Sequence, residues 1–100
     1  MRFNVKTGDT KPLRAQLCYV DGTPIDLTGG VVTFYMGTAV SAGACTIDDA
    51  TNGWVSYPWG AGQTDTAGVY SGEFSVLLGG KISRVPSLGV AEIHIVTKVG

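Results

Sequence analysis

Residues 65–78 read Asp-Thr-Ala-Gly-Val-Tyr-Ser-Gly-Glu-Phe-Ser-Val-Leu-Leu and carry the clearest structural signal in the chain. After a turn that ends at Gly68, large apolar residues alternate with small or polar ones. This two-residue repeat is typical of a β-strand with one buried face, because successive side chains of a strand point to opposite sides. We predict a strand at 69–78, with Tyr70, Phe74, Val76 and Leu78 on the apolar face and Ser71, Glu73 and Ser75 on the other. Gly72 marks a bulge or a close approach of another segment.

Similar short patterns on both sides of this stretch predict further strands, at residues 2–6, 13–19, 31–36, 44–48, 54–59 and 90–96. Pro58 predicts an edge position for the strand at 54–59, because proline cannot donate a hydrogen bond to a neighbouring strand. Between the strands we expect a small-residue connection at 37–43, a loop at 60–67 and an irregular segment at 82–87 around Pro86. No segment keeps a helical repeat over the roughly 10 to 12 residues that a helix prediction needs.

The glycines mark the ends of the predicted strands. The sequence contains 15 of them, and pairs such as Asp21-Gly22 and Asn52-Gly53 are typical of tight turns. Residues 21–29 are expected to form an ordered loop, since Ile25 and Leu27 alternate with polar residues and require burial. We therefore predict an all-β fold, an antiparallel two-sheet immunoglobulin-like β-sandwich of about seven to eight strands, in a single domain over residues 1–100. A small barrel is the structural alternative.

Tyr70 occupies a position with a specific structural meaning. It enters the longest predicted strand directly after the turn that ends at Gly68, which resembles the tyrosine corner of immunoglobulin-like sandwiches. In that corner the tyrosine hydroxyl bonds back to the backbone a few residues upstream. Antibody domains carry a cysteine two residues after this tyrosine, but here the residue is Gly72. No disulfide between the sheets is therefore implied, and Tyr70 with Gly68 is expected to hold the corner.

The composition excludes several classes of protein. Hydrophobic residues make up 44% of the chain and charged residues 15%, a balance too apolar and too weakly charged for disorder. The net charge is -1, and Lys and Arg are not clustered as nucleic-acid binding requires. No apolar run has the length of a signal peptide or a transmembrane helix, so no membrane association is expected. A surface with so little net charge suits a protein that associates, and a homo-oligomer is expected.

The reactive residue types are too scattered to form a catalytic or metal site. His94 is the single histidine, and no nucleophile or orienting group accompanies it. Cys18 and Cys45 lack the spacing of zinc ligands and are expected to be free thiols. The aspartates are expected to form turns rather than a cation site, with Asp21 near Asp26 and Asp48 beside Asp49. We expect no catalytic residue, no metal, no cofactor and no enzymatic activity.

Four aromatic residues are candidate interface or ligand contacts: Tyr35, Trp54, Tyr57 and Trp59. Sandwich faces and edges rich in aromatic rings are common contact surfaces for proteins and carbohydrates. The alternative is structural, because aromatic side chains also dominate the core area of small domains. Either Trp54 or Trp59 fills the core under that alternative, and an exposed ring would mark an interface.

Five segments occur in an order that resembles a known family: residues 6–13 (Lys-Thr-Gly-Asp-Thr-Lys-Pro-Leu), residues 21–29 (Asp-Gly-Thr-Pro-Ile-Asp-Leu-Thr-Gly), the strand at 31–36, Asn52-Gly53 before Val55 and Tyr57, and residues 65–70 followed by Glu73-Phe74. Over nearly its whole length the chain is similar to the immunoglobulin-like N-terminal domain of tailed-phage baseplate upper proteins and to small phage or prophage tail proteins. The resemblance implies a virion structural module, made in the host bacterial cytoplasm, that assembles with other tail or baseplate proteins. It supplies no catalytic residues.

A second class of function remains open at this point. Trp54, Tyr57 or Trp59 would serve as stacking platforms in a module that binds carbohydrate or the host cell surface. An enzyme or an inhibitor of host machinery is a further alternative, which no group of residues in the sequence favours.

Overall fold

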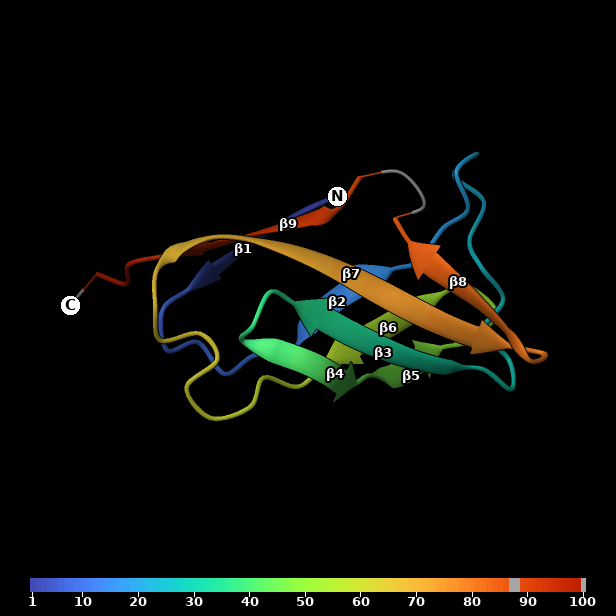
Figure 1. Cartoon of the computed structure of the whole chain (residues 1–100), viewed down its shortest axis with the longest axis horizontal. Coiled ribbons are helices and arrows are strands. Elements are labelled where there is room, and N and C mark those ends of the chain that lie inside the picture. The colour runs from blue at the N-terminus through green and yellow to red at the C-terminus, as the bar shows by residue number, and fades with distance from the viewer. Residues whose placement is uncertain (87–88, 100) are drawn as a thin grey trace.

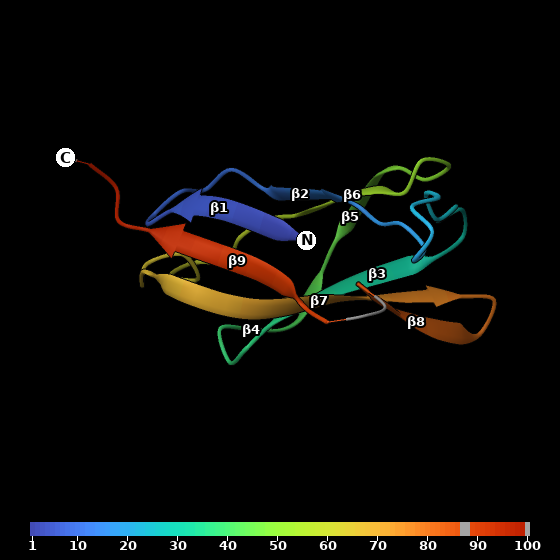
Figure 2. The same ribbon diagram turned by 90° about the horizontal axis from the view of Figure 1, so that it is seen from above.

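The computed structural model describes residues 1–86 and 89–99, which form two stacked β-sheets (Figures 1 and 2). The larger sheet contains β1 (Arg2–Lys6), β9 (Ala91–Val96), β7 (Gly68–Leu78), β3 (Val31–Met36) and β4 (Val40–Ala44) in that order, with β8 (Lys81–Val85) also paired to β7. The smaller sheet contains β2 (Leu13–Gln16), β6 (Trp54–Tyr57) and β5 (Thr46–Asp49). The described residues hold nine strands and no helix, which confirms the all-β, two-sheet prediction. The molecule is elongated, measuring 44 × 23 × 22 Å.

Strand β7 organises the larger sheet and matches the strand predicted at 69–78. One of its sides pairs with β3, while the other side pairs with β9 over its first half and with β8 over its second half. Gly72, Phe74 and Val76 are buried, as the alternation predicted. A Cβ on Gly72 would lie 2.6 Å from Cδ1 of Ile93 and 3.1 Å from the carbonyl oxygen of Tyr35. Glycine is therefore needed where neighbouring strands approach most closely.

Two strands lie where the sequence predicted none. Residues 37–43 were expected to be a connection, but β4 occupies most of this segment and buries Val40. Residues 82–87 were expected to be irregular, yet β8 pairs with β7 as far as Val85; Ser87 lies outside the described residues. Both strands lack a clear repeat, because β4 is built of small residues and β8 buries only its last residue. These two segments form strands because they are hydrogen-bonded to a neighbouring strand, and not because one of their faces is buried.

The topology differs from the prediction in three further respects. Strand β1 pairs with β9 in parallel, so the sheets are not antiparallel throughout. Strand β6 is the central strand of its sheet and not an edge; Pro58 follows its last residue and removes no hydrogen bond from the ladder. Strand β2 ends at Gln16, so the predicted strand at 13–19 is three residues too long, and Tyr19 is exposed. The predicted strand at 90–96 is confirmed, with Ala91, Ile93 and Ile95 buried.

The core lies between the two sheets, and Phe34 is at its centre. Its ring centroid is 4.9 Å from that of Phe74 and 5.1 Å from that of Tyr57. The irregular segment 17–30 adds the buried side chains of Leu17, Ile25 and Leu27, which confirms that this loop is ordered. No described buried polar side-chain atom lacks a hydrogen bond. The core is therefore apolar, with its polar groups satisfied at the margins.

The corner before β7 is held by Tyr70. Its hydroxyl donates a hydrogen bond to the carbonyl oxygen of Thr66, four residues upstream, over 2.7 Å. The ring lies against Gly68, where a Cβ would be 3.5 Å from Cε2 of Tyr70. This is the bond that a tyrosine corner makes.

Removing this hydroxyl should destabilise the fold. Tyr70→Phe keeps the ring and loses the bond to Thr66, so we expect the free energy of unfolding to fall by about 1 kcal/mol. Urea denaturation followed by tryptophan fluorescence measures the change. Tyr19→Phe is the matched control, because Tyr19 is exposed and its hydroxyl bonds to no described residue. Equal effects of the two substitutions would show that the corner bond contributes nothing.

Candidate functional site

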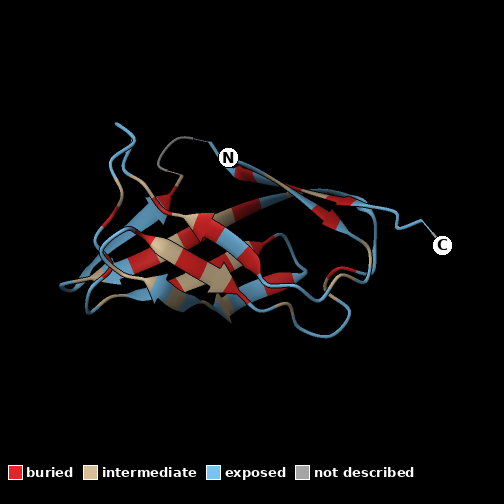
Figure 3. Cartoon of the chain, turned by 180° about the vertical axis from the view of Figure 1, so that it is seen from behind, coloured by how far each residue is buried: buried red, intermediate tan, exposed pale blue. Residues whose placement is uncertain are grey.

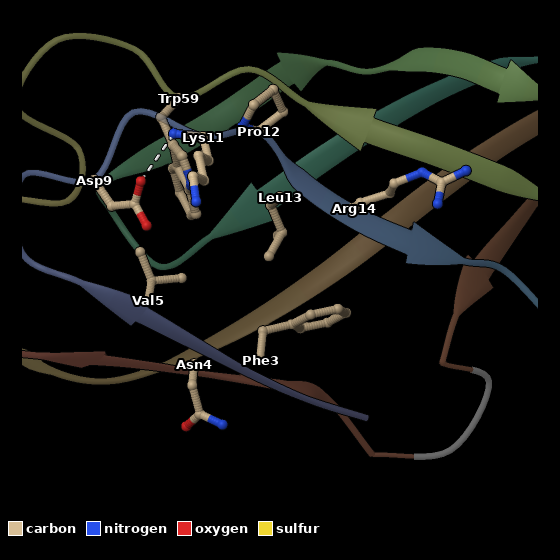
Figure 4. A pocket seen from close by; sticks show the side chains of 9 residues that line it. All are labelled: Phe3, Asn4, Val5, Asp9, Lys11, Pro12, Leu13, Arg14 and Trp59. Carbon is tan, nitrogen blue, oxygen red and sulfur yellow. Dashed lines mark hydrogen bonds between the residues drawn. The ribbon is translucent and has the colours of Figure 1, made fainter.

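A cleft of about 280 Å³ opens between β1 and β2, the edge strands of the two sheets on one side of the sandwich (Figure 4). We call it the β1–β2 cleft. Nine residues line it: Phe3, Asn4, Val5, Asp9, Lys11, Pro12, Leu13, Arg14 and Trp59. Figure 4 shows Phe3, Val5 and Leu13 directed into the space between the two strands, whereas Asn4 and Arg14 point away from it. The floor of the cleft is therefore apolar, and its rim is polar.

The rim of the cleft is held in place by the turn at residues 7–12. Oδ1 of Asp9 accepts a hydrogen bond from the backbone N–H of Lys11 at 3.0 Å. The hydroxyl of Thr64, a buried polar side chain, donates to the carbonyl oxygen of Asp9 at 3.2 Å. Gly8 donates its N–H to the carbonyl oxygen of Thr64 at 3.1 Å. These bonds fix the turn against the 60–67 loop, so the cleft is formed before any partner binds.

Of the four predicted contact aromatics, only Trp59 lines this cleft. It is half-buried and packs at nearly a right angle on Tyr57, with ring centroids 5.4 Å apart. Tyr57 itself is only 5% exposed, and its hydroxyl donates to Oε1 of Gln63 at 2.7 Å. The sequence treated Tyr57 as a possible surface contact, but its ring belongs to the core. Burial of alternate residues in β6 directs Tyr57 inward together with Val55.

Trp54 and Tyr35 lie on the two outer faces of the sandwich, each beside an arginine. The guanidinium of Arg14 is 4.4 Å from the Trp54 ring centroid, and that of Arg84 is 5.8 Å from the Tyr35 ring. Both arginines also pair with carboxylates, Arg14 with Asp48 and Arg84 with Glu73, each at 3.6 Å. The four aromatics are thus distributed over separate places and form no common stacking platform.

A second hollow, of about 540 Å³, lies on the outer face of the larger sheet around Tyr35. Glu73, Arg84, Ser71 and Val90 are among the residues that line it. The sequence did not predict this hollow, because it is bordered by β8, a strand without an alternating pattern. The β1–β2 cleft was missed for a different reason. Phe3, Val5 and Leu13 read as inward residues of two strands, but only the topology places those strands on the same side.

Among the described residues, the histidine lies beside one carboxylate, and the two cysteines lie elsewhere. Nε2 of His94 is 3.1 Å from Oε1 of Glu92, and the two side chains lie on the outer face of β9. Cys18 and Cys45 are free, and burial raises the pKa of the Cys45 thiol to about 12, so that thiol is protonated at neutral pH. No group of three or more His, Cys, Asp or Glu among residues 1–86 and 89–99 could hold a metal ion. In the same residues, no helix is long and apolar enough to span a membrane.

Three aspartates cap turns near one end of the sandwich. The backbone N–H of Thr23 donates to Asp21 at 2.9 Å. Asp26 accepts from the Thr28 hydroxyl at 2.6 Å and from the Thr28 backbone N–H at 3.0 Å. Asp49 accepts from the side-chain amide of Asn52 at 3.0 Å. These hydrogen bonds lower the pKa of all three carboxyl groups below the usual value of 3.8. The aspartates serve the turns and remain ionised at neutral pH.

The lowered pKa values predict a loss of stability in acid. A carboxyl whose pKa is lower in the folded state stabilises the fold above its unfolded pKa, and this contribution disappears as the pH falls through the folded pKa. We expect the free energy of unfolding to decline below about pH 4. Asp26→Asn combined with Asp49→Asn should make that decline shallower, because two of the titrating groups are removed. Urea denaturation at several pH values between about 7 and 2.5 measures it; an unchanged slope in the double variant would contradict the assignment.

Comparison with known proteins gives a match among solved structures. No protein-family model matches the sequence, and no curated protein matches it either. Among solved structures, the N-terminal domain of phage TP901-1 ORF48 superposes with a TM-score of 0.65 at 19% sequence identity. The match covers 99% of this chain and 86% of that chain. The chain is therefore similar in fold, along nearly its whole length, to the N-terminal domain of a phage protein.

Proposed function

We propose that the protein is a non-enzymatic structural component of a bacteriophage or prophage tail, in the baseplate region, and that it acts by binding other virion proteins and further copies of itself. The observation that carries this proposal is the fold shared over 99% of the chain with the N-terminal domain of phage TP901-1 ORF48. The sequence resemblance to the immunoglobulin-like domain of baseplate upper proteins points in the same direction. Under this proposal the sandwich is immunoglobulin-like and the mature protein resides in the virion.

The surface chemistry supports a binding role rather than a catalytic one. The β1–β2 cleft combines an apolar floor with a polar rim, which is the arrangement found in protein interfaces. Its rim is fixed by hydrogen bonds that Asp9 accepts from the Lys11 N–H and the Thr64 hydroxyl, so little conformational entropy is lost when a partner binds. Catalysis needs a nucleophile and a base within hydrogen-bond reach, and the described histidine and cysteines are not arranged in that way.

One observation favours a second candidate, the binding of host-surface carbohydrate. The hollow around Tyr35 brings an aromatic ring together with the charged groups of Glu73 and Arg84 and the hydroxyl of Ser71. Carbohydrate sites combine ring stacking with such polar groups. Titration of the protein with a panel of cell-wall saccharides tests this candidate. Binding that is lost in Tyr35→Ala and kept in Trp59→Ala would support it, and no binding by the wild-type protein would remove it.

Deletion of the gene tests the structural role. In the phage or lysogen that encodes the chain, deletion should leave head assembly intact and yield particles with incomplete tails. The yield of infectious particles should fall by several orders of magnitude, and expression of the wild-type chain in trans should restore it. Normal particles and normal infectivity after deletion would contradict the proposal.

A further inference from the structure

A loop tip, residues 19–23, projects from one end of the elongated molecule (Figure 1). Two backbone hydrogen bonds close it, from the Tyr19 N–H to the Thr23 carbonyl at 2.8 Å and from the Gly22 N–H to the Tyr19 carbonyl at 2.9 Å. A third bond joins the Thr23 N–H to Oδ1 of Asp21 at 2.9 Å. Gly22, with φ of +90°, supplies the backbone conformation that this turn requires. A tip bonded in this way loses little freedom on binding.

The 19–23 tip is exposed along its whole length, as its pale blue colour in Figure 3 shows. Tyr19 is 54% exposed and Val20 is 74% exposed, although both are large apolar residues. Asp21 follows them directly, and its lowered pKa keeps it ionised at neutral pH. Asp26 and Asp49 lie at the same end, because the 21–29 loop is bonded to the β5–β6 turn through the Leu27 N–H and the Ala50 carbonyl at 2.8 Å. This end of the molecule therefore carries three carboxylates, and the exposed apolar side chains of Tyr19 and Val20 lie at its tip.

The β1–β2 cleft has the complementary chemistry. Its floor is formed by Phe3, Val5, Leu13 and Trp59, and Lys11 stands at its rim. Lys6, the last residue of β1, is exposed next to the same turn. Neither lysine forms a salt bridge with a described residue. The Asp9 carboxylate also lies on the rim, where its Oδ1 accepts a hydrogen bond from the Lys11 N–H. Lys6, Lys11 and Asp9 together leave one net positive charge beside the apolar surface of the cleft.

We propose that the 19–23 tip of one copy inserts into the β1–β2 cleft of a second copy, with Tyr19 and Val20 on the apolar floor and Asp21 beside Lys11. The inference rests on the assembly role proposed above and specifies one partner for it. The tip and the cleft are different surfaces of the same chain, so the contact is heterologous. Contacts of this type join copies head to tail into chains or rings, rather than into closed dimers.

The size of the contact sets the expected affinity. A tip of five residues in one cleft buries less than the roughly 1,200 Å² at which stable interfaces begin. We therefore expect weak association of the isolated protein, with a Kd on the order of 0.1 mM. Copies held side by side on a particle would bind more tightly, because each cleft then meets a high effective concentration of the neighbouring copy's tip.

Substitutions that reverse the charge on one surface or on both test the proposal. Sedimentation velocity should show a weight-average mass that grows between about 10 µM and about 1 mM, with a Kd that rises with salt. Lys11→Glu and Asp21→Lys each place like charges at the contact, so each variant alone should associate at least about tenfold more weakly. A mixture of these two variants should associate again, because each tip then meets an oppositely charged cleft. The chain that carries both substitutions should associate more tightly than either single variant, but less tightly than the wild type, because Asp21→Lys also removes the hydrogen bond from the Thr23 N–H that helps to close the tip.

The same experiment contains its controls. All substituted positions are exposed, and circular dichroism checks that each variant is folded. Lys81→Glu changes the net charge by the same amount as Lys11→Glu, but Lys81 lies in the β7–β8 hairpin outside the cleft, so this variant should keep the wild-type Kd. A wild-type chain that stays monomeric at about 1 mM, or a mixture that fails to associate, would overturn the proposal. Either result leaves the gene-deletion test of the tail role unaffected, so the two proposals can fail separately.

Discussion

Phe34→Ala should lower the free energy of unfolding by about 4 kcal/mol, the largest effect expected for any single substitution considered for this protein. The Phe34 side chain is fully buried, and its ring contacts aromatic rings from both sheets. Removing it leaves a cavity between Phe74 on β7 and Tyr57 on β6. The cost exceeds the simple loss of burial, because these strands are held in their ladders and cannot close the cavity.

The control for this prediction lies on the same strand. Val31 begins β3 and is 59% exposed, so Val31→Ala should change the free energy of unfolding by no more than about 0.5 kcal/mol. Urea denaturation of both variants at pH 7 gives the comparison. A loss below about 1.5 kcal/mol for Phe34→Ala would mean that the two sheets are not packed around this ring.

Gly53→Ala should be the second most destabilising substitution, with an expected loss of about 3 kcal/mol. Gly53 has φ of +73°, a conformation that alanine adopts only at a cost. A Cβ at this position would also lie 2.5 Å from the carbonyl oxygen of Leu17 and 3.0 Å from that of Ile25. Backbone atoms of the ordered 17–30 segment cannot move aside as a flexible side chain would. The substitution therefore disturbs the bond from the Leu17 N–H to the Gly53 carbonyl, which is 2.8 Å long.

Gly29→Ala separates the cost of a positive φ from the cost of the close backbone contacts at Gly53. Gly29 has nearly the same φ, +76°, but a Cβ there would meet no atom within 4 Å. It should lose about 1 kcal/mol, the cost of the backbone conformation alone. Thermal and urea unfolding of the two variants measure the difference. Equal losses would show that the 17–30 segment does not press against Gly53.

The sequence predicted the parts of this fold in which burial alternates along a strand. β7 and β9 each have one buried face, and the two-residue repeat of Phe74 and Val76, or of Ile93 and Ile95, is visible without a structure. β4 and β8 escaped prediction because their positions depend on hydrogen bonding to β3 and β7 rather than on their own burial. The parallel pairing of β1 with β9 joins the two ends of the chain, and no local pattern reports such a contact.

The candidate site was only partly predictable for a related reason. Trp59 was identified as a possible contact, and it does line the β1–β2 cleft. Its neighbour Tyr57 was grouped with it because both are aromatic and close in sequence, but the alternation in β6 sends Tyr57 into the core. Lys11 and the 19–23 tip were not predicted as contact sites, although residues 6–13 and the Asp21-Gly22 turn were noted, since the role of a charged or exposed residue in a contact depends on how distant segments are placed relative to one another.

The low net charge of the chain conceals an uneven distribution. Asp21, Asp26 and Asp49 lie near one end, while Lys6 and Lys11 outnumber Asp9 beside the cleft formed by the first two strands. Opposite charges at separate places on a small molecule favour contacts between different surfaces over contacts between identical ones. The arrangement suits a building block that is added in a defined orientation.

The location of the protein in purified particles tests the central proposal most directly. Particles from the phage or lysogen that encodes the chain would be purified by density gradient, analysed by quantitative mass spectrometry, and labelled with gold-conjugated antibody for electron microscopy. The chain should be present in several copies in each particle, and the label should lie at the distal end of the tail. Particles that lack the chain, with the protein found only in the soluble fraction of the infected host, would contradict it.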